Sequence, residues 1–304
     1  MRKAHSKESV ETLCGLFGNS RQAYYQYQKQ HVNDEIMNIT LCTAVAEIRS
    51  SDSRIGGLKL HHMLRDIFGR EAMPGRDSFF RLLRRKGLML EPTKGVRTTN
   101  SNHRYRTYTN RIKEFVPDAP NQLWVSDITY IRLKDKVIYL HLVTDAYSHK
   151  VIGWCLSEGL YAIHTLHALN QAIEQGNNEL FNGLIHHSDR GSQYCSDLYV
   201  KTLKEHGIAI SMTQDSNPTD NAIAERVNGI LKQGCPQINN LETIEQAESA
   251  IGTYIDFYNT KRPHMSIGML TPDQAHTTTG ELKRCWKSKV YPPKQPTSQN
   301  NTYL

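Results

Sequence analysis

The chain has 304 residues, enough for a sizeable core and one or two smaller modules. Its first residues are polar and no apolar run approaches the roughly 20 residues that span a bilayer, which argues against a secreted or membrane protein and predicts a cytoplasmic one. The six cysteines (positions 14, 42, 155, 195, 235 and 285) form no CxxC pair and no Cys/His pattern with zinc-site spacing, so they indicate a reducing compartment.

The formal net charge of +7 is distributed unevenly along the chain. Residues 1–116 carry 21 Lys and Arg against 11 Asp and Glu, a net of +10. Residues 117–304 carry 16 against 19, a net of −3. A basic front half joined to a slightly acidic back half indicates a region that binds a polyanion, attached to a region with a second activity.

The first predicted module, residues 1–32, is a helix-turn-helix. Apolar residues repeat at helical spacing over 10–17, a Gly-Asn-Ser turn at 18–20 ends that helix, and a second helix is predicted over 21–28. Because this second helix opens with Arg21 and carries three tyrosines, it fits a recognition helix that contacts DNA.

A second module resembling a helix-turn-helix is predicted over 33–91. One helix spans 56–68, and after a Pro-Gly turn another helix ends at Gly87. Several cations in this stretch face outward, so we expect them to contact DNA phosphates. These cations are Arg76, Arg81, Arg84, Arg85 and Lys86.

Residues 92–117 have the composition of a basic linker. They hold few aliphatic residues, and their cations alternate with tyrosines, a pattern that suits a segment lying along a DNA backbone. Arg104 and Arg106 are the predicted contacts. At the other end of the chain, residues 281–304 are rich in Pro, Gln and Asn and are predicted to be disordered.

Residues 118–280 predict an α/β core. Three strands joined by tight turns form an antiparallel meander, after which helices and strands alternate. This order predicts an RNase H-like mixed five-stranded sheet with flanking helices, preceded by the all-α helix-turn-helix modules. The predicted strands are 123–133, 137–147, 150–157, 183–189 and 208–212, and the predicted helices are 161–175, 196–207, 220–233 and 242–258.

Three acidic residues are predicted to converge on this sheet. The first strand lies centrally and the fourth pairs beside it in parallel, so Asp127 on the first can approach Asp189 at the end of the fourth. Glu225 lies on the helix that packs on the sheet. Carboxylates this close repel one another without cations, and an all-oxygen ligand set suits two Mg²⁺ or Mn²⁺ ions. Four other acids are predicted to be turn or cap residues: Asp145, Asp197, Asp215 and Asp220.

Four segments resemble one known family: "WVSDITYI", "HHSDRGSQYCS", "NPTDNAIAERVNGILK" and "YIDFYNTKRPHMSIGMLTP". They are similar to the catalytic core of bacterial insertion-sequence DDE transposases of the OrfB type, which are relatives of retroviral integrases. Between Asp189 and Glu225 lie 35 residues (225 − 189 − 1), the interval that marks the family. The resemblance covers residues 5–276. It implies DNA contacts by Lys232, seven residues after the glutamate, and by Arg262 and His264 in the last segment.

The resemblance implies a DNA transposase that cleaves at the terminal inverted repeats of its element and joins the freed 3′-hydroxyl, through a circular intermediate. Its implied partners are the double-stranded repeats, target DNA in the bacterial nucleoid and a homodimer or larger synaptic assembly. In many relatives an upstream frame supplies a further helix-turn-helix and a zipper. Because no heptad run precedes the first helix here, a product of such a frame is a further expected partner. Two alternatives stay open: a non-catalytic DNA-binding regulator of the element, or an RNase H-like nuclease.

Overall fold

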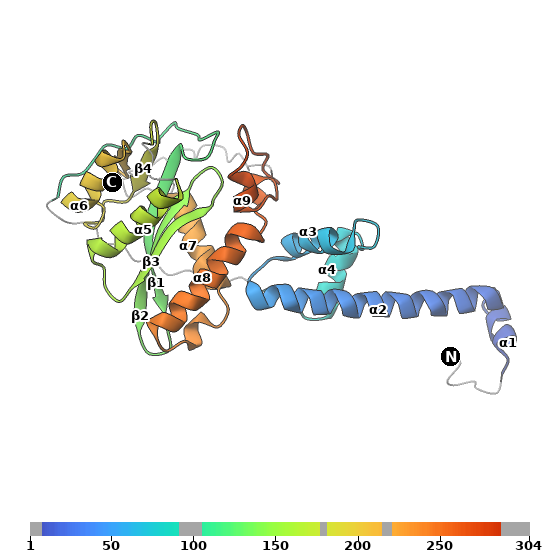
Figure 1. Ribbon diagram of the computed structural model, residues 1–304. Helices are drawn as coiled ribbons and strands as arrows, with labels where there is room; N and C mark the ends of the chain where they lie inside the picture. Colours follow the sequence, from blue (N-terminus) through green and yellow to red (C-terminus); the bar gives the residue numbers. More distant parts are fainter. Residues whose placement is uncertain (1–7, 91–104, 177–180, 215–220, 287–304) are drawn as a thin grey trace, which may run out of the picture.

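The computed structural model of the chain describes residues 8–90, 105–176, 181–214 and 221–286. A helical front part and an α/β core follow one another along the chain, and the front part extends away from the core (Figure 1). Of the predicted basic linker, residues 105–117 are described and contain no helix or strand. The tail predicted to be disordered comprises residues 281–304. Most of it, residues 287–304, lies outside the described ranges.

The front part consists of the helices α1 (Val10–Gly15), α2 (Arg21–Ser51), α3 (Gly57–Phe68) and α4 (Arg76–Arg85). Serine side chains cap the first two: Ser9 accepts a hydrogen bond from the Thr12 backbone N–H, and Ser20 accepts one from that of Ala23. The second half of α2 packs its apolar side chains against α3 and α4 (Figure 1). The buried members of this cluster are Leu41, Val45, Ile55, Leu60, Leu64, Met73, Phe79, Leu82 and Leu83.

The predicted end of the second helix at residue 28 is wrong, because α2 continues without a break to Ser51. The predicted boundary between the two modules, at residues 32 and 33, therefore falls inside a single helix. The stretch "KQHVNDE" at 29–35 is polar, so no apolar repeat marks it as helical in the sequence. Residues 21–51 also contain no Gly or Pro that would end a helix.

The core holds the predicted mixed sheet of five strands: β1 (Leu123–Arg132), β2 (Val137–Asp145), β3 (Val151–Ser157), β4 (Ile185–Ser188) and β5 (Ala209–Met212). Their order is β3-β2-β1-β4-β5. The first three strands pair antiparallel, and β4 pairs in parallel with both β1 and β5. The predicted fold class is thus confirmed, and β1 lies in the centre of the sheet.

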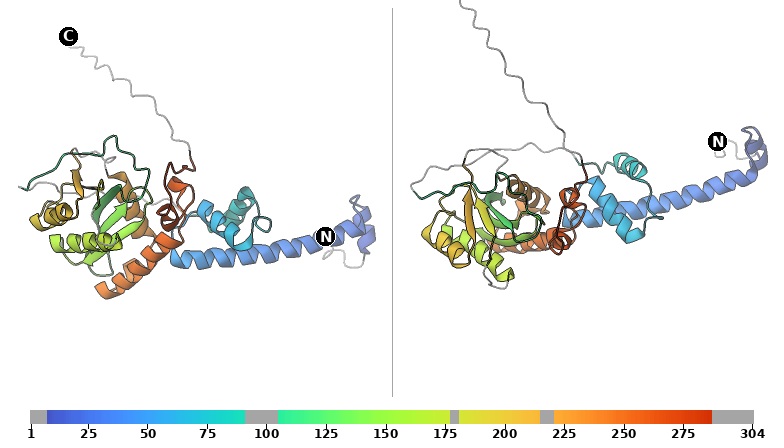
Figure 2. Two further views of the ribbon diagram at one scale, coloured as in Figure 1. Left: turned by 45° about the horizontal axis from the view of Figure 1, so that its top comes forward. Right: turned by 90° about the horizontal axis from the view of Figure 1, so that it is seen from above.

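Helices cover both faces of this sheet (Figure 2). On one face, α5 (Ala162–Gln175) and α6 (Asp197–Glu205) pack against a cluster that includes Trp124 of β1. On the other, α7 (Ala222–Gly234) and α8 (Ile244–Thr260) pack against a cluster that includes Ile131 of β1. Alternate residues of a strand point to opposite faces, so β1 supplies side chains to both layers.

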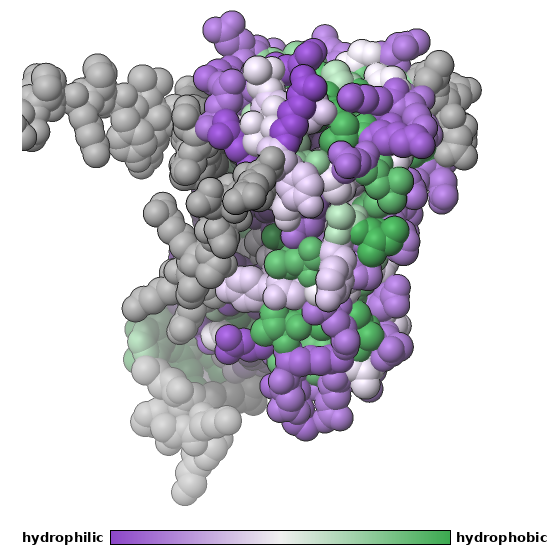
Figure 3. Space-filling model, turned by 90° about the vertical axis from the view of Figure 1, so that its left-hand side faces the viewer, coloured by the Kyte–Doolittle hydropathy of each residue, from purple (hydrophilic) through white to green (hydrophobic). Residues whose placement is uncertain are grey.

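Shorter elements complete the core: the 3-10 turns η1 (Ile238–Asn240) and η2 (Met265–Ile267) and the helix α9 (Pro272–Ala275). The end of the core that faces away from α2 mixes hydrophilic residues with interspersed hydrophobic ones (Figure 3). Among the helices in the described residues, none has the length and apolar character needed to cross a membrane.

A buried ion pair joins the front part to the core. The Arg262 Nε atom donates to Asp52 Oδ2 at 2.8 Å, and both side chains are almost inaccessible to solvent, with 6% and 0% exposed. Asp52 follows α2, and the next residue, Ser53, donates its backbone N–H to the carbonyl of Gly234 at the end of α7. A Cβ at Gly234 would overlap the Tyr254 hydroxyl group, so only glycine fits this contact. The end of α2 is therefore docked beside the end of α7.

Candidate active site

The strand register brings Asp127 and Asp189 together. In the parallel pair of β1 and β4, Trp124 lies opposite His186 and Val125 opposite His187. The same register continued by two residues sets Asp189, which follows the last residue of β4, beside Asp127. The backbone N–H of Gly191 donates to Asp189 Oδ1 at 2.9 Å, which holds this carboxylate in the turn after β4. The predicted approach of the two aspartates is thus present in the structure.

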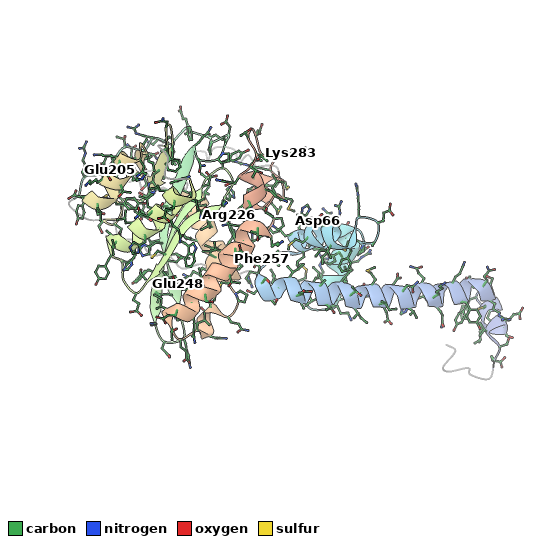
Figure 4. The ribbon with its side chains drawn as sticks, viewed as in Figure 1. Asp66, Glu205, Arg226, Glu248, Phe257 and Lys283 are labelled. Atoms are coloured by element: carbon green, nitrogen blue, oxygen red, sulfur yellow. The ribbon has the colours of Figure 1, made fainter. Side chains whose placement is uncertain are left out.

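Helix α7 brings Glu225 to the same region. The Asn221 side chain, at the start of α7, donates to the carbonyl of Ser126 in β1 and so ties the helix to the strand that carries Asp127. Glu225 lies in the first turn of α7 and is exposed. Figure 4 labels the next residue, Arg226, and so marks this turn within the core. One turn further on, Asn228 Nδ2 donates to Asp127 Oδ2 at 2.7 Å.

The pKa of Asp127 is strongly shifted by its surroundings in the site. Burial raises the pKa of its carboxyl group to about 7, and the charges of Asp189 and Glu225 act in the same direction. The backbone N–H of Ile128, at 2.9 Å, and the Asn228 side chain lower this pKa without offsetting the rise. A carboxyl group near half protonation at neutral pH lacks a counter-charge. A divalent cation bound by these oxygens would supply one, so the donor set fits Mg²⁺ or Mn²⁺.

Two residues near the acids were missed by the sequence analysis. Asn228 is buried and hydrogen bonded to Asp127, and its position three residues after Glu225 is the signal that could have identified it. Tyr194 is 1% exposed, and burial together with the charges of Asp189 and Asp127 raises the pKa of its hydroxyl well above the usual range. Tyr194 belongs to the segment "HHSDRGSQYCS", but nothing in that segment distinguishes it from its neighbours, because the fold brings it near both aspartates.

Lys232 lies on α7 two turns after Glu225, as predicted. Its Nζ atom is 3.3 Å from the centroid of the Tyr130 ring, a cation–π contact with a residue of β1. Tyr130 is three residues after Asp127 on that strand. The ring holds the partly buried lysine in place without cancelling its charge.

Arg262 and His264, two of the predicted DNA contacts, are buried in the structure. Arg262 is 5% exposed and binds Asp52, whereas His264 is 2% exposed and packs its ring on Tyr258. Burial, followed by the charge of Arg262, lowers the pKa of His264 well below the usual range. Arg262 holds the junction between α2 and the core, whereas His264 packs within the core. A sequence does not distinguish a buried cation from an exposed one, so this burial was not foreseen. DNA contact by these two residues stays a prediction.

The predicted basic side chains of the front part are exposed. Arg81, Arg84, Arg85 and Lys86 are exposed at the end of α4, and Arg76 at its start pairs with Asp77 at 3.0 Å.

The side chains of Arg21 and Arg106 each lie over a tyrosine ring, at 5.9 Å from Tyr25 and 5.6 Å from Tyr108. Arg104 lies outside the described residues. DNA contact by the described cations stays a prediction.

The other acids have the structural surroundings predicted for them where they are described. Asp145 ends β2 and accepts hydrogen bonds from the backbone N–H groups of Asn121 and Ser148, at 2.8 and 2.7 Å. Asp197 lies in the first turn of α6. Asp215 and Asp220 lie outside the described residues.

Comparison with known proteins places this core in a family. The integrase core domain family matches residues 117–218, and a second integrase core domain family matches residues 206–272. A 31 kDa protein of insertion element IS600 from Shigella sonnei is 33% identical over 266 residues, which cover 86% of this chain and 96% of that protein. The transposase for insertion sequence element IS629, also from Shigella sonnei, is 27% identical over 280 residues, covering 90% and 93%.

Among solved structures, the HTLV-2 integrase catalytic core domain in complex with magnesium is 24% identical, with a TM-score of 0.41, and the match covers 52% of this chain and 97% of that one. The match to the IS600 protein extends over most of both chains, and the two integrase core domain families match the α/β core. These two findings together assign the chain to a family. The chain belongs to the bacterial insertion-sequence DDE transposases, of the OrfB type.

Proposed function

We propose that this transposase cleaves DNA at the terminal inverted repeats of its element and performs strand transfer with the freed 3′-hydroxyl, using Asp127, Asp189 and Glu225. The observation that carries the proposal is the raised pKa of Asp127 beside two further acids, where β1, the turn after β4 and α7 each contribute one acid. A buried carboxyl group whose pKa is raised by neighbouring acids is typical of catalytic centres.

The three carboxylates are the proposed ligands of two Mg²⁺ or Mn²⁺ ions. The solved HTLV-2 integrase core contains magnesium, and oxygen-only donors suit hard cations better than zinc. When bound, such ions activate the attacking oxygen at a phosphodiester and stabilise the leaving oxygen.

The protein groups around the acids have positioning roles in this proposal. Asn228 orients the Asp127 carboxylate, and the Gly191 backbone N–H orients that of Asp189. Lys232, held over Tyr130, grips the DNA backbone beside the scissile phosphate. The cations of the front part bind the repeats. By family resemblance, the reaction passes through a circular intermediate. Two ends must meet, which requires a homodimer or larger assembly, with an upstream-frame product as a further partner.

The test is cleavage of a DNA that carries the element's ends by Asp127→Asn, Asp189→Asn and Glu225→Gln. Each change removes a charge at nearly constant shape, so we expect cleavage to fall by about 1,000-fold or more while end binding persists. Asp197→Asn, a change of an exposed acid in α6, is the matched control and should cleave normally. Full cleavage by any of the three variants removes that residue from the site.

Two substrate controls separate the alternatives. A wild-type chain that binds the ends but does not cleave them with Mg²⁺ or Mn²⁺ acts as a regulator. Cleavage of RNA–DNA hybrids in preference to the element's ends identifies an RNase H-like nuclease.

A further inference from the structure

Away from the acids, one cysteine and two histidines bring their metal-binding atoms together. The Cys155 Sγ atom and one ring nitrogen each of His164 and His167 all lie within 4.8 Å of one another. Cys155 is on β3, the edge strand of the sheet, and both histidines are on α5. Residues three apart on a helix share a face, so the two imidazoles point the same way, toward the edge strand.

The packing of α5 on β3 fixes these positions. A Cβ at Gly153 would overlap the backbone carbonyl of Ala168, so the helix lies directly on the strand there. The backbone N–H of Trp154, next to Cys155, donates to Gln171 Oε1 at 2.8 Å. Gln171 is four residues after His167, on the same side of α5. One strand and one helix therefore hold the three ligand atoms close together without an ion.

The exposure of the three side chains also suits a metal site. Cys155 and His164 are partly buried, whereas His167 is exposed. The cysteine is a free thiol, as are all the cysteines of the described residues. The cluster is thus reduced, pre-positioned and open to solvent on one side.

We propose that Cys155, His164 and His167 form a binding site for a divalent ion of the zinc class. One sulfur and two imidazole nitrogens are the donors that Zn²⁺ and Co²⁺ prefer, and they are poor ligands for Mg²⁺. Three protein ligands leave the fourth tetrahedral position open, on the exposed side of His167. A bound ion cross-links edge strand β3 to α5.

This site is separate from the three acids. In the sheet register, Cys155 pairs with His141, which pairs with Ile128, so two strand spacings, about 10 Å, separate Cys155 from the residue next to Asp127. Cys155 packs with the α5 side of the sheet, whereas Asp127 contacts α7 on the other face. The ligand order, C-x8-H-x2-H, differs from common zinc spacings, which is why the sequence did not reveal it.

The experiment is a titration of the untagged, full-length, reduced chain with Co²⁺, followed by competition for Zn²⁺ against a chromophoric chelator. We expect one tightly bound ion per chain and a thiolate-to-cobalt charge-transfer band. Cys155→Ser should abolish the band. His164→Ala and His167→Ala should weaken Zn²⁺ binding by more than about 100-fold, since loss of an outer-shell partner alone costs about 10–100-fold. The controls, Cys285→Ser and His62→Ala, lie elsewhere and should bind like wild type.

Thermal unfolding gives a second, independent readout. Zn²⁺ should raise the melting temperature of wild type and of both controls, and leave that of His167→Ala unchanged. His167 is exposed, so this variant should fold normally and keep the test valid if Cys155→Ser is unstable.

Equal Zn²⁺ binding by wild type and the three ligand variants overturns the proposal, as does the absence of a charge-transfer band in wild type. Cleavage with Mg²⁺ is measured in parallel. We expect the ligand variants to keep it, so a failure of the zinc site and a failure of the acid site are distinguished.

Discussion

Two buried aspartates of this molecule, Asp52 and Asp127, have opposite electrostatic surroundings. At the junction of α2 with the core, Asp52 is fully buried and its charge is balanced by Arg262 at 2.8 Å. In the sheet, Asp127 has two acidic neighbours and no basic partner within the described part of the chain, and its pKa rises to about 7. A balanced pair stabilises a fixed contact between parts. A buried carboxylate with a raised pKa, such as Asp127, destabilises the fold unless a cation binds there, and such groups are typical of functional sites.

Asp145 shows that burial alone does not produce the difference. It ends β2, next to β1, and is as deeply buried as Asp52. Burial raises its pKa, but hydrogen bonds from His276, Ser148 and Asn121 outweigh that effect and lower the pKa overall. Asp127 and Asp145 therefore lie on neighbouring strands with pKa shifts of opposite sign.

The largest expected effect is the loss of the balancing charge at the junction. Arg262→Ala removes the ion-pair partner of the fully buried Asp52, so we expect the free energy of unfolding to fall by about 3–5 kcal/mol. Urea unfolding measures this. Removing both charges in Asp52→Asn with Arg262→Met should recover most of the loss, and Lys261→Ala, at the exposed neighbouring cation, should have little effect. A stable Arg262→Ala variant that no longer binds DNA would instead support the prediction that Arg262 contacts DNA.

The burial of Arg262 is an example of a feature that the sequence does not predict. The order of strands and helices, and with it the convergence of Asp127 with Asp189, follows from local pattern and from the parallel register. Whether a cation after a helix end points to DNA or into a core depends on what packs there. For Arg262 that is Asp52, 210 residues away in sequence. The length of α2 was missed for a related reason, since tertiary contacts with α3 and α4 support its second half.

The second prediction concerns pH and Asp127. Because its folded pKa lies above the ordinary value of 3.8, folding favours the protonated form. Without metal, this group's contribution to stability therefore falls as pH rises from about 4 to about 7. Asp127→Asn cannot ionise, so with chelator we expect it to gain about 1–3 kcal/mol over wild type between pH 5 and pH 8. Mg²⁺ should stabilise wild type at pH 8 and reduce the gap.

Asp145→Asn supplies the opposite sign for that experiment. Its folded pKa is lowered, so the ionised form stabilises the fold, and the stabilisation is lost as pH falls through the folded pKa. We expect Asp145→Asn to be less stable than wild type at pH 8, with or without Mg²⁺. A destabilised Asp127→Asn at pH 8 in chelator would contradict the view that Asp127 lacks a counter-charge.

The third prediction tests unbalanced positive charge in the front part. Arg81, Arg84 and Arg85 are exposed on α4, and replacing all three with Ala should weaken binding to the element's ends by about tenfold at moderate salt. The slope of log affinity against log salt should fall by up to about one for each phosphate that is no longer neutralised. Fluorescence anisotropy over a salt series measures both. Lys204→Ala, at an exposed cation of α6 in the core, is the control and should bind the ends like wild type. An unchanged affinity and salt slope in the triple variant would contradict DNA binding by α4.

The smallest expected effect lies at Lys232, a cation held by a ring rather than by an acid. Its Nζ atom, 3.3 Å from the Tyr130 ring centroid, keeps its charge while the ring restricts its motion. Tyr130→Leu should leave the lysine charged but less well placed, and slow strand joining by a factor equivalent to about 0.5–1 kcal/mol. Lys232→Ala should slow joining more and Lys232→Arg less, because Arg keeps both the charge and the stacking. None of these changes should alter the metal requirement, since the lysine lies two turns, roughly 10 Å, from Glu225 along α7. If Tyr130→Leu slows joining while Lys232→Ala does not, the ring itself contacts DNA, and the lysine is an ordinary solvent-facing residue of the helix.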